Sequence, residues 1–230
     1  MKVVAIVSAD GEWQVVTELL PGQQIEATPM GECFEHQGVT FFHGGWGKIS
    51  AAATAQYVID RFQPELLVNL GTCGGFEGRI ERGAIVLAER TIVYDILEQM
   101  TDPEQAIAHY STKLDLSWLP RVLPFPVLRG PLISADRDIV LEDIPMLVKK
   151  YNAVAADWES GAIAWVAHSN GIRLLILRGV SDLVGAEGGE AYGNYELFLR
   201  RTREIMKKLL EQLPRWLDAI EKVGQGLRGY

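Results

Sequence analysis

Three carboxylates follow predicted buried strands of this 230-residue chain, at positions where they could carry out acid–base chemistry. Glu12 comes soon after the apolar run Val3–Val7, and Asp182 comes soon after Leu174–Leu177. Glu159 follows a third, shorter apolar run. In open α/β sheets, ligands bind beyond the carboxyl ends of the strands, so the three side chains could converge in one cleft. Three carboxylates in one cleft indicate acid–base catalysis.

Each acidic residue also has a simpler structural interpretation. Asp10 could cap the helix that follows the first strand, and Glu12 in its first turn would complement the helix dipole. Asp157 or Ser160 could cap a later helix in the same way. An isolated Ser-Asp pair, such as the one that ends at Asp182, is usually part of a turn. The coincidence of three carboxylates at one predicted sheet edge favours chemistry over capping.

Two glycine-rich segments also follow predicted strands. Gly71–Gly75 comes after Leu66–Leu70, and its glycines would let the backbone approach a ligand closely. The segment has neither the three spaced glycines of a dinucleotide site nor the Lys-Ser or Lys-Thr pair of a P-loop, and a purely structural tight turn is the alternative. Gly44–Lys48 opens a helix and could receive a ligand or simply turn. Within it, we expect Trp46 to pack rather than to take part in chemistry.

The elements that must position these residues alternate between apolar strands and helices. Short, nearly continuous runs of Val, Ile and Leu are typical of strands that are buried on both faces of a largely parallel sheet. Their alternation with segments of helical spacing predicts an α/β fold: a single-domain, three-layer α/β/α architecture with a mixed, largely parallel central sheet. The predicted strands are Val3–Val7, Leu66–Leu70, Ala84–Ala88, Val127–Ile133 and Leu174–Leu177. The predicted helices are Gly11–Leu20, Lys48–Phe62, Ile139–Lys150 and Ser160–Ser169.

Two regions depart from this alternation. Gln37 and Gly38 separate the strand candidates Ala27–Phe34 and Val39–His43, which predicts an antiparallel hairpin added to the parallel core. Four prolines interrupt residues 98–126, so we expect that region to be rich in loops.

The C-terminal part of the chain is expected to cover the sheet. Tyr195–Val223 is a long amphipathic segment, and we expect Pro214 to bend or stop the helix that it forms. The predicted domain spans residues 1–223, and residues 224–230 are expected to be a frayed tail.

Composition excludes several classes of partner. A formal net charge of −8 and a pI near 5.1 argue against binding to nucleic acid or to anionic membranes, which needs clustered Lys and Arg. No run of about 18 apolar residues is present, so no spanning helix is expected. Only Cys33 and Cys73 could pair, which favours a reducing cytoplasm over a disulfide framework. The four histidines lack ligand spacing, so neither a metal nor a cofactor is expected.

These segments together resemble the nucleoside phosphorylase superfamily, and most closely its methylthioadenosine/S-adenosylhomocysteine nucleosidases. The resemblance spans about Met1 to Arg200. It implies a nucleoside phosphorylase-like fold, a small-molecule purine nucleoside as substrate, and a homo-oligomer, with a dimer favoured, in which a neighbouring subunit closes the pocket. The segments that carry it, in this order and spacing, are Ala5–Glu12, Gly44–Ala53, Asn69–Gly75, Ile133–Ile139, Asp157–Val166 and Arg178–Asp182.

The resemblance also implies roles for individual residues. Asp182 would protonate the purine at N7 with help from Ser181, and Glu12 would activate water. Glu159 would hydrogen-bond the ribose 2′-hydroxyl, and Trp158 would pack on the ribose. Ile139 would contact the base partly through its backbone, and Tyr195 and Phe198 are candidates to meet the 5′-group. The further substrate-binding positions are Thr72, Cys73, Gly74, Asp157 and Arg178.

The chemistry of glycosidic cleavage is consistent with these roles. Positive charge develops on the sugar and negative charge on the departing base, so a carboxylate near the ribose and an acid at the base both favour the transition state. Keeping Asp182 protonated at pH 7 requires its pKa to rise by about three units from about 3.9, or roughly 4 kcal/mol. Glu12 must instead stay ionised, which requires a wetter or more hydrogen-bonded position.

The nucleophile and the exact substrate remain open at this point. Related phosphorylases carry an arginine just before the Gly-Thr pair, where this chain has Asn69 and Leu70, and Glu12 would repel phosphate, so water is favoured. We therefore expect hydrolysis of the N-glycosidic bond of a 5′-modified purine nucleoside. Trp158, Ala135 and Asp138 depart from the family pattern and could alter specificity. The alternatives are a phosphorylase, a futalosine-type hydrolase, a non-catalytic nucleoside sensor, or an unrelated doubly wound domain.

Overall fold

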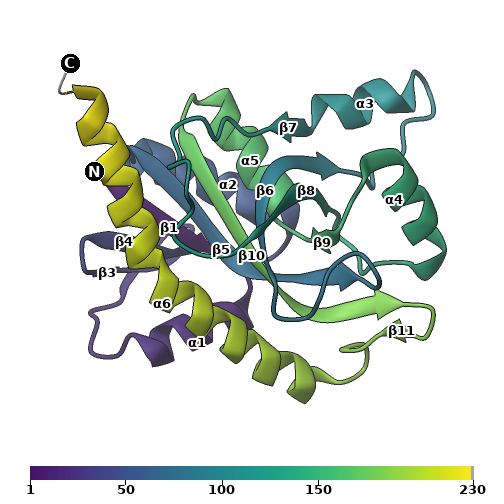
Figure 1. Cartoon of the computed structure of the whole chain (residues 1–230), viewed down its shortest axis with the longest axis horizontal. Helices are drawn as coiled ribbons and strands as arrows, with labels where there is room; N and C mark the ends of the chain where they lie inside the picture. The colour runs from purple at the N-terminus through teal and green to yellow at the C-terminus, as the bar shows by residue number, and fades with distance from the viewer. Residues whose placement is uncertain (229–230) are drawn as a thin grey trace.

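The chain folds around one mixed β-sheet with helices on both faces (Figure 1), as the sequence predicts. The computed structural model describes residues 1–228. The strands are β1 (Val3–Val7), β2 (Glu26–Thr28), β3 (Gly31–His36), β4 (Val39–His43), β5 (Leu66–Phe76), β6 (Ile85–Val93), β7 (Ser111–Lys113), β8 (Leu128–Ser134), β9 (Ala155–Asp157), β10 (Arg173–Gly185) and β11 (Gly188–Gly189). The helices are α1 (Asp10–Leu19), α2 (Gly47–Phe62), α3 (Pro103–His109), the 3₁₀ turn η1 (Leu141–Asp143), α4 (Ile144–Tyr151), α5 (Ser160–Ser169) and α6 (Tyr195–Arg228).

Five of the strands pair with one another in a closed ring. Along the sheet the order is β11-β10-β6-β8-β9-β5-β1-β4-β3-β2, and β7 pairs with β6. In addition, β5 pairs in parallel with β10 and antiparallel with β9. The strands β5, β10, β6, β8 and β9 therefore form a closed ring. Strand pairing is not encoded in the hydrophobic pattern, so this closure was not foreseen.

The apolar residues of the central strands alternate between two cores. In β1, Val4 and Ile6 pack on the side of α2 and α5, whereas Ala5 and Val7 pack on the side of α1 and α6. Both faces of the sheet are buried, which explains why β1 has an uninterrupted apolar sequence. Figure 1 shows α6 crossing in front of the sheet. The predicted hairpin is confirmed, because β3 and β4 pair antiparallel across Gln37 and Gly38.

The glycine-rich segment and the Ser-Asp pair are strand, not turn. β5 continues through Gly71–Gly75 to Phe76, and β10 continues to Gly185. Each strand supplies the backbone partners of the other, which favours extended structure over a turn. The register shifts between Val180 and Asp182, so Ser181 is the extra residue of a bulge. Such bulges redirect side chains, and this one lies where the sequence predicted the acid.

Helix α6 does not stop at Pro214. It continues to Arg228, past the expected boundary at residue 223, and residues 229 and 230 lie outside the described part of the chain. Proline inside a helix costs about 3 kcal/mol. Leu213 and Trp216, on either side of it, are almost fully buried against the sheet. Their burial offsets that cost, since a buried large apolar side chain contributes about 1.5–3 kcal/mol.

Residues 98–126 are mostly irregular, as expected from their prolines, but they also contain α3 and β7. Pro103 begins α3 rather than interrupting it, and the Asp102 side chain caps the helix by accepting from the Glu104 N–H at 2.9 Å. The α-helix predicted over Ile139–Lys150 is shorter in the structure, because its first part forms the 3₁₀ turn η1 and α4 begins only at Ile144.

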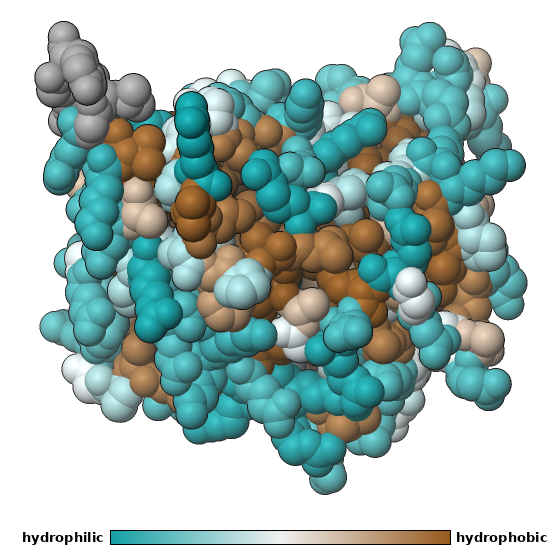
Figure 2. All heavy atoms as spheres, viewed as in Figure 1, coloured by the Kyte–Doolittle hydropathy of each residue, from teal (hydrophilic) through white to brown (hydrophobic). Residues whose placement is uncertain are grey.

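The surface in front of the sheet is mainly polar at its edges. In the same view, Figure 2 shows hydrophobic residues gathered toward the middle of the face and hydrophilic residues around them. None of the helices within residues 1–228 is long and apolar enough to cross a membrane.

Substitution of Gly179 in β10 tests how closely α6 packs on this strand. A Cβ at this position would lie 2.2 Å from the Ile205 Cγ2 atom of α6. We expect Gly179→Ala to lower the free energy of unfolding by about 1–3 kcal/mol, because the packed interface cannot take the extra methyl group. Urea denaturation measures this change. Gly130→Ala in β8 is the control, since its Cβ would meet nothing closer than 3.6 Å. Equal stabilities of the two variants would contradict the assignment.

Candidate functional site

A cavity of about 670 Å³ opens at the carboxyl ends of the central strands. This volume is in the usual range for small-molecule sites. Every residue that the sequence analysis placed in the site lines the cavity except Arg178, which lies buried behind it. Those lining residues are Glu12, Thr72, Cys73, Gly74, Ile139, Asp157, Trp158, Glu159, Ser181, Asp182 and Tyr195.

The buried Arg178 side chain links three carboxylates behind the cavity. Its Nε atom lies 2.9 Å from Asp157 Oδ2, and its Nη2 atom lies 3.5 Å from Glu159 Oε2. Its Nη1 atom lies 3.8 Å from Glu12 Oε1. Burial alone would lower the pKa of Arg178, but these carboxylates outweigh it and raise the pKa. The guanidinium is therefore a fixed positive charge.

Strand β5, which pairs with β10, leaves space for the Arg178 side chain. Gly71 pairs with Arg178 across β5 and β10, and a Cβ on Gly71 would lie 2.0 Å from Arg178 Nη1. Arg178 also donates to Asn69 Oδ1 at 2.9 Å and to Ser160 Oγ at 3.0 Å. The glycine that the sequence suggested for ligand approach therefore makes room for a side chain of the protein itself.

Glu12 is held by two donors and keeps one oxygen unpaired. Its Oε1 accepts from the Thr72 backbone N–H at 2.5 Å and from Thr72 Oγ1 at 2.8 Å. Its Oε2 is buried and has no hydrogen-bond partner among the described residues. The expected hydrogen-bonded position is confirmed, but a wetter one is not, because Glu12 is only 2% exposed against 6% for Asp182. The free oxygen can accept a proton.

The capping role proposed for Asp10 is wrong. Ala9 occupies the N-cap of α1 and makes no side-chain cap bond, and Asp10 Oδ1 instead lies 3.1 Å from His43 Nε2. At α5 the capping interpretation of Asp157 holds in part. Glu159 is the N-cap residue, but the Asp157 carboxylate accepts from the Ser160 backbone N–H at 3.2 Å.

The hydrogen-bonding capacity of the Asp157 carboxylate is used by other residues of the protein. Besides Arg178 and the Ser160 N–H, it accepts from Ser134 Oγ at 2.6 Å and from the Ser160 hydroxyl. It lines the cavity, yet its hydrogen bonds hold Arg178 and α5 in place. Glu159 is less firmly held, because its closest donor is the Gly47 backbone N–H at 3.3 Å. Burial raises the pKa of Glu159 to about 8 against the opposing effect of Arg178.

Asp182 lies at the other side of β5 in a setting that favours its protonated form. Burial raises the pKa of its carboxyl group, and the hydrogen bond from Ser181 opposes this rise. Ser181 Oγ lies 2.6 Å from Asp182 Oδ1 and 3.3 Å from the Cys73 carbonyl oxygen, so the hydroxyl can donate to either. Burial thus moves the pKa of a carboxyl group that lines the cavity toward the protonated form.

Aromatic side chains surround the mouth of the cavity. Trp46 stacks on the Trp158 ring, with centroids 4.9 Å apart, and it is 65% exposed and lines the cavity. Sequence reasoning missed Tyr192, whose hydroxyl donates to the Ile139 carbonyl oxygen at 3.0 Å. The Tyr192 ring lies against Gly189, where a Cβ would come within 2.6 Å of it. Nothing in the loop sequence signals this fold-back.

The cavity has little positive charge with which to bind an anion. Asn69, where related phosphorylases have arginine nearby, donates to the Ile6 carbonyl oxygen at 3.1 Å and accepts from Arg178, so its amide is used within the protein. Among the described lining residues, the one cation is Arg137, which pairs with Asp143 at 2.5 Å. Residues 1–228 contain no cluster of His, Cys, Asp and Glu suited to a metal ion.

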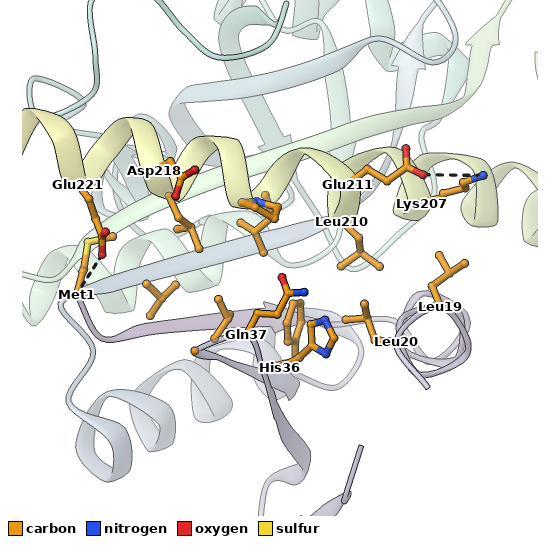
Figure 3. A pocket seen from close by; sticks show the side chains of 17 residues that line it. Met1, Leu19, Leu20, His36, Gln37, Lys207, Leu210, Glu211, Asp218 and Glu221 are labelled. Atoms are coloured by element: carbon orange, nitrogen blue, oxygen red, sulfur yellow. Dashed lines mark hydrogen bonds and ion pairs between the residues drawn. The ribbon is translucent and has the colours of Figure 1, made fainter. Parts of the chain in front are cut away.

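A second cavity of about 740 Å³ lies between α6, α1 and the β3–β4 hairpin. Figure 3 shows two ion pairs among the residues that line it, one between the Met1 amino group and Glu221 and one between Lys207 and Glu211. The nearby His36 ring bonds Gln23 Nε2 at 2.8 Å. Among the described residues that line it, no buried acid faces a base, so catalysis is better placed at the first cavity.

The raised pKa of Glu159 predicts a pH-dependent stability. Between about pH 4.5 and pH 8 the unfolded chain releases this proton while the folded chain keeps it, so stability falls as the pH rises through this range. We expect Glu159→Gln, which cannot titrate, to gain stability relative to the wild type between pH 5 and pH 8, on the order of a few kcal/mol. Urea denaturation of both proteins measures the difference, and an equal difference at both pH values would contradict it.

Comparisons with known proteins show the family to which the chain belongs. The model of the Phosphorylase superfamily matches residues 4–215. A 5′-methylthioadenosine/S-adenosylhomocysteine nucleosidase from Maridesulfovibrio salexigens is 30% identical over 166 residues, 66% of this chain and 71% of that protein. One from Tolumonas auensis is 26% identical over 196 residues, 80% of this chain and 85% of that protein.

Solved structures share the fold. A mutant nucleosidase from Helicobacter pylori with 5′-methylthioadenosine in the active site has a TM-score of 0.75 at 18% identity, covering 93% of this chain and 98% of that one. The Streptococcus pneumoniae enzyme with a transition-state inhibitor has a TM-score of 0.74 at 19% identity, covering 96% of this chain and 100% of that one. This chain belongs to the phosphorylase superfamily.

Proposed function

We propose that this protein hydrolyses the N-glycosidic bond of a 5′-modified purine nucleoside of the methylthioadenosine/S-adenosylhomocysteine type. One observation carries the proposal: a carboxyl group that favours its proton and a carboxylate with an unpaired oxygen face one cavity. Thr72 binds Glu12, and the adjacent Cys73 carbonyl accepts from Ser181 beside Asp182. Acid and base are thus tied to neighbouring residues of β5. Both relatives described above are 5′-methylthioadenosine/S-adenosylhomocysteine nucleosidases, which supports the same reaction.

The proposed reaction is one displacement at the anomeric carbon. Asp182 donates its proton to N7 of the purine, and the electrons of the C1′–N9 bond leave with the base. Water attacks C1′ and gives its proton to the free Oε2 of Glu12. Glu159 hydrogen-bonds the ribose 2′-hydroxyl, and the negative charges of the site stabilise the positive sugar. The products are the free purine and the free sugar.

The structure also supports a homodimer in a reducing cytoplasm. Cys33 and Cys73 are free and buried, so they do not form a disulfide with each other. Ile49 and Leu97 are strongly exposed apolar side chains close in sequence to the ion pair between Lys48 and Asp95. Exposed apolar surface is a feature of protein–protein interaction sites. A second subunit would cover them.

Base release with and without phosphate separates hydrolysis from phosphorolysis. We expect release from methylthioadenosine, adenosylhomocysteine or futalosine at rates that phosphate does not change, because the cavity has one cation and that cation is paired. Chromatography of the released base measures the rate, and inosine tests the need for a 5′-modification. Strict dependence on phosphate would replace the proposal with a phosphorylase. Tight calorimetric binding without any base release would replace it with a nucleoside sensor.

Asp182→Asn tests the acid directly. The amide keeps the shape of the carboxyl group but cannot donate its proton to N7, and loss of a general acid reduces turnover by about 10²–10⁴-fold. We expect kcat to fall by this amount while the Kd of the nucleoside changes little. Asp218→Asn, in the second cavity, is the matched control and should keep wild-type kcat. An unchanged kcat in Asp182→Asn would reject Asp182 as the acid.

A further inference from the structure

We propose that Glu190 positions Asp182 for proton transfer by joining the strand that carries it to helix α6 and to the loop that lines the cavity. This inference rests on the proposed function and adds a positioning residue to its site. Among the described residues, Glu190 is not one of those that line the cavity, so it acts through Asp182 rather than on the substrate.

The Glu190 side chain completes the hairpin that follows Asp182. Strands β10 and β11 pair antiparallel, and their register places Leu183 opposite Glu190. The Glu190 N–H donates to the Leu183 carbonyl oxygen at 3.0 Å, and the Leu183 N–H donates to Glu190 Oε2 at 3.0 Å. In an ordinary antiparallel pair the second bond would go to a backbone carbonyl oxygen. Because the side chain accepts this bond, the backbone after Glu190 can turn toward the cavity, which residues 191–195 line.

Two arginines hold the Glu190 carboxylate. Its Oε2 atom lies 2.9 Å from Arg201 Nη1 of α6 and 3.4 Å from Arg82 Nε, in the segment between β5 and β6. The Arg201 side chain is only 15% exposed, so its ion pair is partly shielded from solvent screening. Burial alone would raise the pKa of Glu190, but the Leu183 N–H and the two arginines outweigh it and lower the pKa. Glu190 is therefore ionised at neutral pH.

Glu190 also offsets the charge of Arg201 near Asp182. Burial is the main cause of the raised pKa of Asp182, and of the two charges Arg201 lowers this pKa whereas Glu190 raises it. Two further titratable groups interact with Asp182, the Cys73 thiol of β5 and the Tyr192 hydroxyl of the loop. Burial raises the pKa of both, that of Tyr192 to about 12, so both are uncharged at neutral pH. The paired charges of Glu190 and Arg201 thus oppose each other at the acid, whereas Arg201 alone would favour its ionised form.

Neutral variants of these two charges should move the pKa of Asp182 in opposite directions. In Glu190→Gln the amide oxygen can still accept from Leu183, but Arg201 loses its partner. We expect the basic limb of the kcat–pH profile for 5′-methylthioadenosine to move down by about one pH unit, which is about tenfold lower kcat on that limb. Arg201→Gln leaves the negative charge and should move the limb up. Glu190→Gln/Arg201→Gln should bring the limb back close to that of the wild type, with KM unchanged throughout.

The matched control is Glu187→Gln, which removes an exposed carboxylate from the turn between β10 and β11 and should leave the profile unchanged. Urea denaturation shows whether each variant is folded across the pH range of the assay. A purely structural role would move the limb in the same direction in Glu190→Gln and Arg201→Gln, or would leave the double variant no closer to the wild type than either single one. Either result would overturn the proposal.

Direct titration of Asp182 separates this proposal from the proposed function. In protein isotopically labelled at the aspartate carboxyl carbon, the NMR signal that is lost in Asp182→Asn reports the pKa of Asp182 without any turnover. A pKa that falls in Glu190→Gln and is restored in the double variant supports the proposal even if no base is ever released. An unchanged pKa in Glu190→Gln would overturn it, whereas absence of base release from the wild type would overturn only the hydrolase.

Discussion

The site is organised around one buried positive charge, that of Arg178. Burying an ion costs several kcal/mol, so such a side chain is stable only with good partners, and removing one partner typically costs about 3–5 kcal/mol. Asp157, at 2.9 Å, is the principal partner, and Ser134 and Ser160 satisfy its remaining lone pairs. Three carboxylates share the one guanidinium, and this excess of negative charge is partly relieved by the raised pKa of Glu159. A site with surplus negative charge suits a reaction in which the sugar becomes positive.

The closed ring of strands explains how these charges come together. β5 and β10 run in parallel, and their long extensions bring Gly71 and Thr72 alongside Arg178 and Gly179. The carboxylates come from α1 (Glu12), β9 (Asp157) and the N-cap of α5 (Glu159), and each contacts a residue that the β5 or β10 extension carries. Because the extensions are paired backbone, the side chains that they carry are held by the sheet itself, which gives more precise positioning than loops can.

Much of this arrangement could be predicted from sequence, and the failures have identifiable causes. The apolar runs located the central strands, and the acidic residues that follow them do line one cavity. The glycines of β5 were misassigned to a turn because their role depends on distant residues: Gly71, for example, makes room for the side chain of Arg178, more than 100 residues away. Pro214 was expected to bend or stop a helix that in fact continues past it, since local rules cannot weigh the burial of Leu213 and Trp216. Tyr192 was missed because its position depends on a fold-back over Gly189.

Burial alone does not determine which carboxyl group of the site acts as acid. Glu12 and Asp182 are both buried, with exposed fractions of 2% and 6%, so burial does not distinguish them. The two carboxyl groups differ in their hydrogen-bond donors. Glu12 accepts two hydrogen bonds from Thr72 and lies 3.8 Å from the Arg178 guanidinium. Asp182 has one donor, the Ser181 hydroxyl, which can instead donate to the Cys73 carbonyl oxygen. Hydrogen bonds and positive charge favour the ionised form where they are present. The same strand, β5, supplies donors to one carboxylate and an acceptor beside the other, and this asymmetry supports the proposed roles of Glu12 as base and Asp182 as acid.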